Sequence, residues 1–123
     1  MPQDQISGAT ANTAGYTRAK RVAKYLGAVL TNPGKSNEAT WNGKSICIKS
    51  ARHGNTLIGV TLAMLSHVQS VVAAIQEPNG KFTIFEVPST WFSNEMRVPA
   101  NWANIGFVQC AKIRNAGVLI GSV

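Results

Sequence analysis

The segment NEATWNGKSICIKSAR, residues 37–52, carries a carboxylate, a thiol and an ammonium group around a dipeptide that is typical of hairpin turns. Asn42-Gly43 favours a two-residue type I′ turn, and this turn places Glu38 directly opposite Cys47. Because side chains alternate along a strand, Lys49 projects from the same face as Cys47. The residue types and their spacing therefore predict a cluster of reactive groups on one side of a small hairpin.

The two faces of this predicted hairpin differ in polarity. The apolar face holds Ala39, Trp41, Ile46 and Ile48, and the polar face holds Ser36, Glu38, Thr40, Ser45, Cys47 and Lys49. On a solvated face, a cross-strand pair of Glu38 and Lys49 would contribute only a few tenths of a kcal/mol. The alternative is a binding site, because the polar segment 50–55 follows at the strand end, where α/β proteins commonly bind ligands.

Positive charge is concentrated in the first half of the chain. The whole sequence has 12 Lys and Arg against 5 Asp and Glu, a net charge of +7, and residues 1–52 alone hold eight basic side chains against two acidic ones. A basic half suits a polyanion, most simply DNA, whereas a basic surface that only confers solubility is the alternative. The residues predicted to contact DNA are Arg18, Arg21, Lys24, Lys35, Arg52, His53 and Asn55.

The length of 123 residues fits one domain with a single core. Residues 1–14 are polar and are predicted to form a flexible leader before a single domain over residues 15–123. No apolar run reaches the roughly 18 residues of a membrane-spanning helix, and the first residues lack the apolar core of a secretory signal. Two cysteines do not make a disulfide framework, so we expect a cytoplasmic protein without a membrane partner.

The apolar pattern predicts an α/β fold with a mixed central β-sheet and flanking helices. The predicted helices cover residues 16–26, 55–68 and 89–96, and the predicted strands cover residues 28–32, the hairpin arms, 70–75 and 81–88. Residues 55–68 carry a broad apolar stripe at helical spacing, which Gly59 interrupts. The continuous apolar run over 70–75 predicts a strand that is buried on both faces.

Several other motifs point away from particular chemistries. Neither glycine-rich phosphate-binding pattern is present, so no nucleotide cofactor is expected. The cysteine and histidine spacings do not suit zinc. A Cys47–His53 hydrolase pair would lack a third group to orient it. Trp91 and Phe92 could stack on bases, although a place in a helix core is commoner, and the strands that follow the basic helix argue against a helix-turn-helix protein.

The order of the predicted elements resembles the PD-(D/E)XK nuclease superfamily, especially archaeal Holliday-junction resolvases and small restriction endonucleases. The likeness covers residues 16–88, with Asn37-Glu38 in the place of the "PD" and Cys47-Ile48-Lys49 in the place of the "(D/E)xK". It implies a restriction-endonuclease-like core and a metal-dependent deoxyribonuclease that hydrolyses DNA phosphodiesters. Glu38 would bind Mg²⁺ or Mn²⁺, and Lys49 would stabilise the attacking water or the phosphate charge.

The motif departs from the family at Cys47, because a thiol is a poor ligand for the hard Mg²⁺ ion. Metal-dependent hydrolysis usually needs a second carboxylate, and Glu77 is the candidate for a relocated ligand. Two further functions are open: an inactive nucleic-acid-binding or accessory subunit of the same fold, and a structural or protein-interaction module. An enzyme of this size that cuts both strands would act as a homodimer.

Overall fold

The computed structural model describes residues 15–32 and 36–123. The predicted leader over residues 1–14 and the predicted DNA contact Lys35 lie outside these described residues. The described chain begins with a helix over residues 15–26, which confirms the helix predicted there. The elements that follow are β1 (Val29–Leu30), β2 (Glu38–Trp41), β3 (Lys44–Ala51), β4 (Leu57–Thr61), α2 (Leu62–His67), β5 (Ser70–Gln76), β6 (Phe82–Pro88), α3 (Ser89–Glu95), η1 (Ala100–Trp102), β7 (Ile105–Gln109), α4 (Cys110–Ala116) and β8 (Val118–Ser122).

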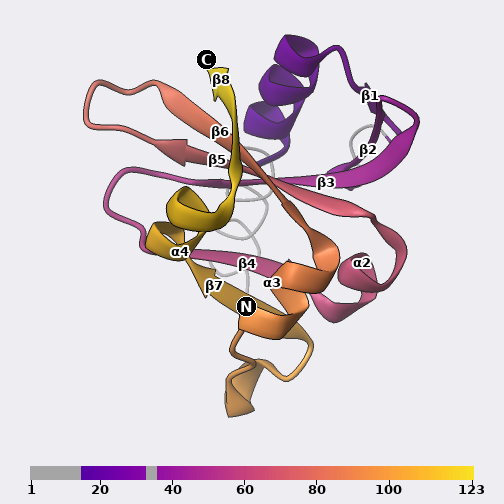
Figure 1. Ribbon diagram of the computed structural model, residues 1–123, viewed down its shortest axis with the longest axis vertical. Coiled ribbons are helices and arrows are strands. Elements are labelled where there is room, and N and C mark those ends of the chain that lie inside the picture. Colours follow the sequence, from indigo (N-terminus) through magenta and orange to yellow (C-terminus); the bar gives the residue numbers. More distant parts are fainter. Residues whose placement is uncertain (1–14, 33–35) are drawn as a thin grey trace, which may run out of the picture.

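The main sheet has six strands in the order β1-β2-β3-β5-β6-β8 (Figure 1). Strands β3 and β5 are parallel, and every other neighbouring pair in this sheet is antiparallel. The segment between β3 and β5 crosses over through β4 and α2, as a parallel pair requires. The predicted mixed sheet with flanking helices is therefore confirmed at the level of fold class.

The β2–β3 hairpin has the predicted register. Glu38 pairs with Cys47 and Trp41 pairs with Lys44. Both turn residues have positive φ, 51° at Asn42 and 77° at Gly43, as a type I′ turn requires. The Asn-Gly dipeptide therefore fixes which side chains of the two strands share a face.

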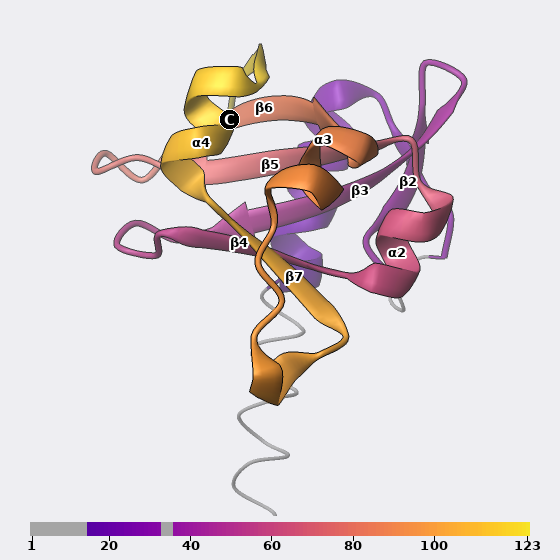
Figure 2. The same ribbon diagram turned by 60° about the horizontal axis from the view of Figure 1, so that its bottom comes forward.

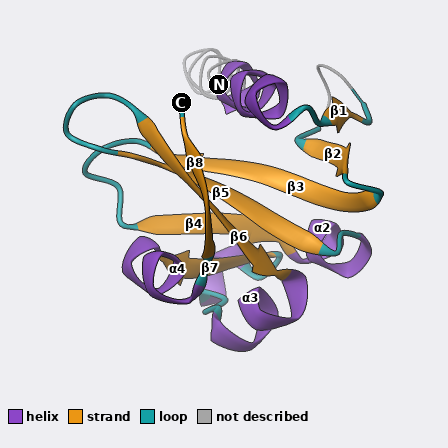
Figure 3. Cartoon of the chain, turned by 45° about the horizontal axis from the view of Figure 1, so that its top comes forward, coloured by secondary structure: helices purple, strands orange, loops and turns teal. Residues whose placement is uncertain are grey.

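The helix over residues 15–26 covers one face of the main sheet (Figure 3). Its buried side chains Ala19, Val22 and Ala23 recur at helical spacing. They pack in one core cluster with Ile46 and Ile48, from the predicted apolar face of the hairpin. This interface explains why the helix turns its charged side chains outward.

A second layer covers the opposite face of the main sheet. It contains the two-stranded antiparallel sheet of β4 and β7 together with the short helices α2, α3 and α4 (Figure 2). Ile58 and Val60 of β4 lie in the same core cluster as Phe92 of α3 and Ile113 of α4. Because both faces of β5 are covered, six of its seven residues are buried, as its apolar run predicts.

The prediction of one helix over residues 55–68 is wrong for the first half of this segment. Leu57–Thr61 forms β4, and only Leu62–His67 forms a helix, α2. Ile58 and Val60 alternate inward at strand spacing, and β-branched side chains favour a strand that can pair, here with β7. Thr61 then begins α2, because its hydroxyl oxygen accepts a hydrogen bond from the Met64 amide.

The strands predicted over residues 70–75 and 81–88 and the helix predicted over 89–96 are confirmed as β5, β6 and α3. The sequence did not predict β7, α4 and β8, the last of which is an outer strand of the main sheet. Within the described part of the chain, no helix is long and apolar enough to cross a membrane.

Candidate functional site

Glu38 lies beside His67 on the polar face of the hairpin. The Nε2 atom of His67, the last residue of α2, is 2.9 Å from Glu38 Oε1. The exposed fraction of the side chain is 23% for Glu38 and 51% for His67, so the pair lies at the surface. The crossover through β4 and α2 brings this histidine to the hairpin, 29 residues along the chain from Glu38.

The second ring nitrogen of His67 limits what this pair can do. Nδ1 is 2.7 Å from the carbonyl oxygen of Ala63, which can only accept, so Nδ1 carries a proton. The contact with an ionised Glu38 is a hydrogen bond only when Nε2 carries a proton as well. Both ring nitrogens of His67 are therefore taken up by oxygen atoms of the protein, Ala63 O and Glu38 Oε1, rather than directed toward a metal.

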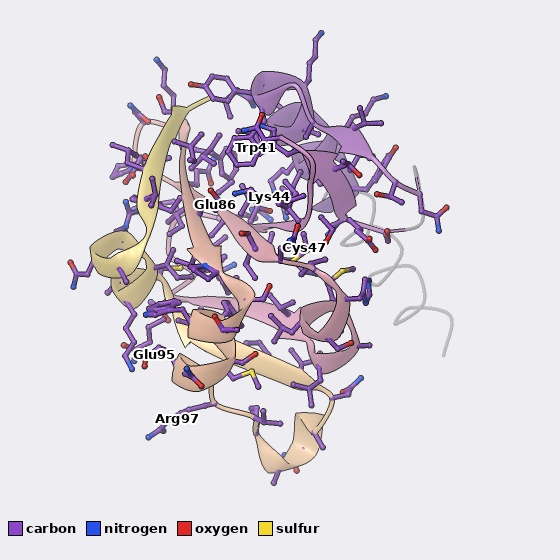
Figure 4. All side chains as sticks on the ribbon, turned by 45° about the vertical axis from the view of Figure 1, so that its right-hand side comes forward. Trp41, Lys44, Cys47, Glu86, Glu95 and Arg97 are labelled. Atoms are coloured by element: carbon purple, nitrogen blue, oxygen red, sulfur yellow. The ribbon has the colours of Figure 1, made fainter. Side chains whose placement is uncertain are left out.

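Cys47 is completely buried, although it lies on the face predicted to be polar. It packs in the core cluster that contains Val71, Ala73 and Val60, so β4 covers this part of the hairpin (Figure 4). Burial raises the pKa of the Cys47 thiol to about 12, against the lowering effect of the charge on Lys49. A buried, protonated thiol does not act as a nucleophile or a metal ligand.

The side chains near Glu38 do not supply the ligands that Mg²⁺ requires. Among residues 15–32 and 36–123, no group of three or more His, Cys, Asp or Glu side chains is placed to hold one ion. Cys47 offers sulfur rather than oxygen, and His67 already occupies one Glu38 oxygen. We therefore derive no hydrolytic step through a metal at this position.

Glu77 does not join Glu38 in the structure. Glu38 is level with Val71 of β5, and Glu77 lies six residues further along, about 20 Å at the rise of a strand. Its carboxylate accepts hydrogen bonds from Arg114, at 2.7 and 3.1 Å, and from Thr83, at 2.6 Å. The hydrogen bonds from Arg114 and then Thr83 hold the pKa of Glu77 below its usual value.

Several residues predicted to bind DNA lie near one another in the structure, whereas the predicted metal ligands Glu38 and Glu77 lie apart. Arg18 crosses from the helix over residues 15–26 to the end of β3, where its Nε donates a hydrogen bond of 2.6 Å to Ser50 Oγ. Burial and then the nearby charge of Arg52 lower the pKa of Arg18. The hydrogen bond to Ser50 thus brings Arg18 to the C-terminal end of β3, which Arg52 directly follows.

Three further cations of the same helix are exposed. Together with the two arginines they form what we term the basic patch: Arg18, Lys20, Arg21, Lys24 and Arg52. The neighbouring loop after β3 carries the predicted contacts His53 and Asn55, both exposed. The His53 amide donates to Gln76 Oε1 at 3.0 Å, which ties this loop to the end of β5.

The basic patch has no carboxylate partner among the described residues, because the four described glutamates are engaged elsewhere. Their ion pairs are Glu38 with His67, Glu77 with Arg114, Glu86 with Lys44, and Glu95 with Lys112. Figure 4 shows Glu86 and Lys44 close to Trp41, and Lys44 Nζ lies 5.2 Å from the centre of that ring. The described glutamates are therefore all engaged outside the basic patch, and none of them compensates its charge.

The remaining predicted contacts are structural. Phe92 is completely buried between α3 and the main sheet, and Trp91 packs against the same core cluster, so the core interpretation of this pair is confirmed.

The sequence did not predict that His67 and Arg114 pair with glutamates, because each meets its glutamate only after the chain has crossed the sheet. A histidine or arginine alone at an element end gives no signal of such a pairing.

Comparisons with known proteins do not assign a family. No protein-family model matches this sequence, and no curated protein matches it.

Proposed function

We propose that the chain is a DNA-binding protein that uses the basic patch to bind the phosphate backbone. The observation that carries this proposal is the hydrogen bond that holds Arg18 at Ser50, two residues from the like charge of Arg52, without a carboxylate partner among the described residues. Two like charges repel each other until an anion binds between or beside them, and arginine suits phosphate because its planar group donates in a fork.

The position of the pair supports the same ligand. Arg52, His53 and Asn55 follow the C-terminal end of β3, which is parallel to β5. Open α/β sheets commonly bind ligands beyond the carboxyl ends of parallel strands. The exposed lysines of the helix extend this anchor along the surface, which suits a ligand with repeated phosphates rather than one small anion.

The experiment is a titration of a fluorescently labelled DNA duplex, read by anisotropy. Arg18→Gln and Arg52→Gln should each weaken binding by roughly threefold to tenfold at low salt, the effect of one charge-assisted hydrogen bond. Lys112→Gln is the matched control, because it removes an exposed cation on α4, on the other side of the main sheet. Equal affinities for all four proteins would overturn the proposal.

A metal-dependent endonuclease of restriction-endonuclease-like fold is the second candidate function. The observation in its favour is the register that sets Glu38 opposite Cys47, with Lys49 on the same face. The test is incubation of supercoiled and branched DNA with Mg²⁺ or Mn²⁺, with Glu38→Ala and Lys49→Ala beside the parent chain. If this candidate is right, the parent chain cuts DNA and both substitutions abolish cleavage. If neither the parent chain nor the variants cut, the endonuclease is rejected and non-catalytic DNA binding is the proposed function.

The partner and location predicted from the sequence also stay proposals. A second copy of the chain would meet the outer strand β8, where Val118 and Leu119 are each 64% exposed. No charged residue protects this edge, and unprotected edges pair readily. Sedimentation of the parent chain and of Leu119→Lys would show whether a homodimer forms through it. We also propose a cytoplasmic location, which the two free cysteines support.

A further inference from the structure

The outer face of the β4–β7 sheet carries a second site, which none of the basic-patch residues lines. A cavity of about 600 Å³ lies there between the sheet, the end of α3 and the η1 turn. This face looks away from the core, since Ile58 and Val108 point inward and their neighbours point outward. The main sheet lies between the β4–β7 sheet and the helix over residues 15–26 (Figure 3).

The floor of the cavity is an aromatic ring that the neighbouring strand supports. Phe107 of β7 pairs with Gly59 of β4, and a Cβ atom at position 59 would lie 2.7 Å from Phe107 Cε1. The absence of a side chain at Gly59 therefore lets the ring lie across the strand. Leu57, 47% exposed, adds an apolar wall beside it.

The backbone places Arg97 directly opposite Phe107, at the rim of the cavity. Arg97 pairs with Phe107 through two hydrogen bonds, N to O at 2.9 and 2.8 Å, so the two residues are held side by side. The Arg97 side chain is exposed and has no ion pair within the described chain. The other charges at the rim neutralise one another, because Lys112 Nζ is 3.5 Å from Glu95 Oε1. Figure 4 shows Arg97 pointing away from the body of the molecule, near Glu95.

Polar groups at the rim complete the lining. Asn101 of η1 and Gln109 of β7 each offer an amide that can both donate and accept hydrogen bonds. The cavity thus combines a supported aromatic ring, an apolar wall, one uncompensated guanidinium and two amides. Its volume lies within the range of small-ligand sites.

We propose that this cavity binds a single unpaired nucleotide, with the base against Phe107 and the phosphate at Arg97. Aromatic side chains stack on bases of any kind, and arginine is the preferred partner of a phosphate. The amides of Asn101 and Gln109 can meet the polar edge of the base, which a purely apolar ligand would leave unpaired. The site does not depend on the proposed binding of duplex DNA, because none of the basic-patch residues lines the cavity.

The experiment measures binding of dAMP to the full chain by calorimetry, with adenosine and deoxyribose 5-phosphate as probes of the base and phosphate halves. Arg97→Gln should weaken dAMP binding roughly tenfold and leave adenosine binding unchanged. Phe107→Leu, which keeps an apolar side chain, should weaken both dAMP and adenosine by roughly tenfold. Lys81→Gln is the charge-matched control, in the exposed turn between β5 and β6, and should bind dAMP as the parent chain does.

Arg97→Gln keeps the test decisive if Phe107→Leu fails to fold, because it changes only an exposed side chain. The proposal is overturned if the parent chain does not bind dAMP, or if Arg97→Gln binds it as tightly as the parent. Capture of an acidic peptide by the cavity in preference to dAMP would overturn it as well. Arg18→Gln should bind dAMP normally even where it loses duplex binding, so the failure of either proposal can be recognised separately.

Discussion

At the scale of single residues, burial decides what a reactive group can do. Cys47 and Glu38 are direct neighbours across the β2–β3 hairpin, yet one is completely buried and the other reaches the surface. The side chain of Cys47 enters the core beneath β4, whereas Glu38 near the sheet edge meets His67. Alternation along a strand predicts which face of the sheet a side chain points to. Whether that face is exposed to solvent depends on the second layer of strands and helices that packs on it.

The buried state of Cys47 predicts that its thiol is unreactive in the folded protein. Burial raises its pKa to about 12, so almost no thiolate exists near pH 8. We expect iodoacetamide to leave Cys47 unmodified under native conditions and to label it rapidly in denaturant. Mass spectrometry of peptides from timed reactions measures this difference. Rapid native labelling of Cys47 would mean that β4 does not cover it.

A carboxylate at position 47 should lower the stability of the fold rather than create a metal site. Cys47→Asp restores the acid of the nuclease motif, but it places a charge at a completely buried position, where burial outweighs the favourable charge of Lys49. We expect Cys47→Asp to lower the free energy of unfolding by at least about 2 kcal/mol, with Cys47→Ser losing less. Urea denaturation measures both variants. If Cys47→Asp were as stable as the parent and gained Mg²⁺ affinity, the position would be a metal site.

At the scale of elements, local signals predicted the hairpin but not the crossover. Asn42-Gly43 sets the register by its own backbone geometry, so the hairpin faces follow from the sequence. The segment 57–61 satisfies helical and strand spacing together, and its partner β7 lies about 50 residues away. Whether residues 57–61 form a helix or a strand depends on this distant partner, so a local pattern cannot predict it. The pairing of Glu38 with His67 also depends on the crossover and is equally hidden from the local sequence.

The apolar face of the hairpin should carry much of the stability of the main sheet. Ile48 is 1% exposed and packs beneath the helix over residues 15–26. We expect Ile48→Ala to lower the free energy of unfolding by about 2–5 kcal/mol, because it removes buried methyl groups and leaves a cavity. Thermal and urea denaturation would show the loss. Thr40→Ala, at an exposed position of β2, is the control and should change stability little.

The Glu77–Arg114 pair should make stability depend on pH in the acid range. The pKa of Glu77 is lowered in the fold, so the pair stabilises the protein fully above the ordinary carboxyl pKa of about 4.3. This contribution is lost as the pH falls through the lower folded pKa. Because the pair is partly exposed, Glu77→Gln should cost at most about 1 kcal/mol at pH 7 and nothing in strong acid. A difference that grew toward low pH would contradict the assignment.

At the scale of the whole molecule, the described carboxylates and the basic patch are kept apart. Composition already predicts a basic N-terminal half, and the fold shows where the compensation occurs: the four described glutamates pair with cations or a histidine outside the basic patch. The sequence alone could not show this, because it gives the number of charges but not their partners. Five cations without an ion pair to these glutamates are consequently gathered on the helix over residues 15–26 and the end of β3.

This separation predicts the salt dependence of DNA binding. Each phosphate that a cation neutralises releases counterions and adds about 0.9 to the slope of log affinity against log salt. A contact surface made of the basic patch should therefore give a steep slope, and Lys24→Gln should reduce it by about one unit. Lys112→Gln, whose cation is paired with Glu95 on the other layer, should leave the slope unchanged. A flat response in the parent chain, or the same slope in Lys24→Gln, would show that the patch does not face the DNA.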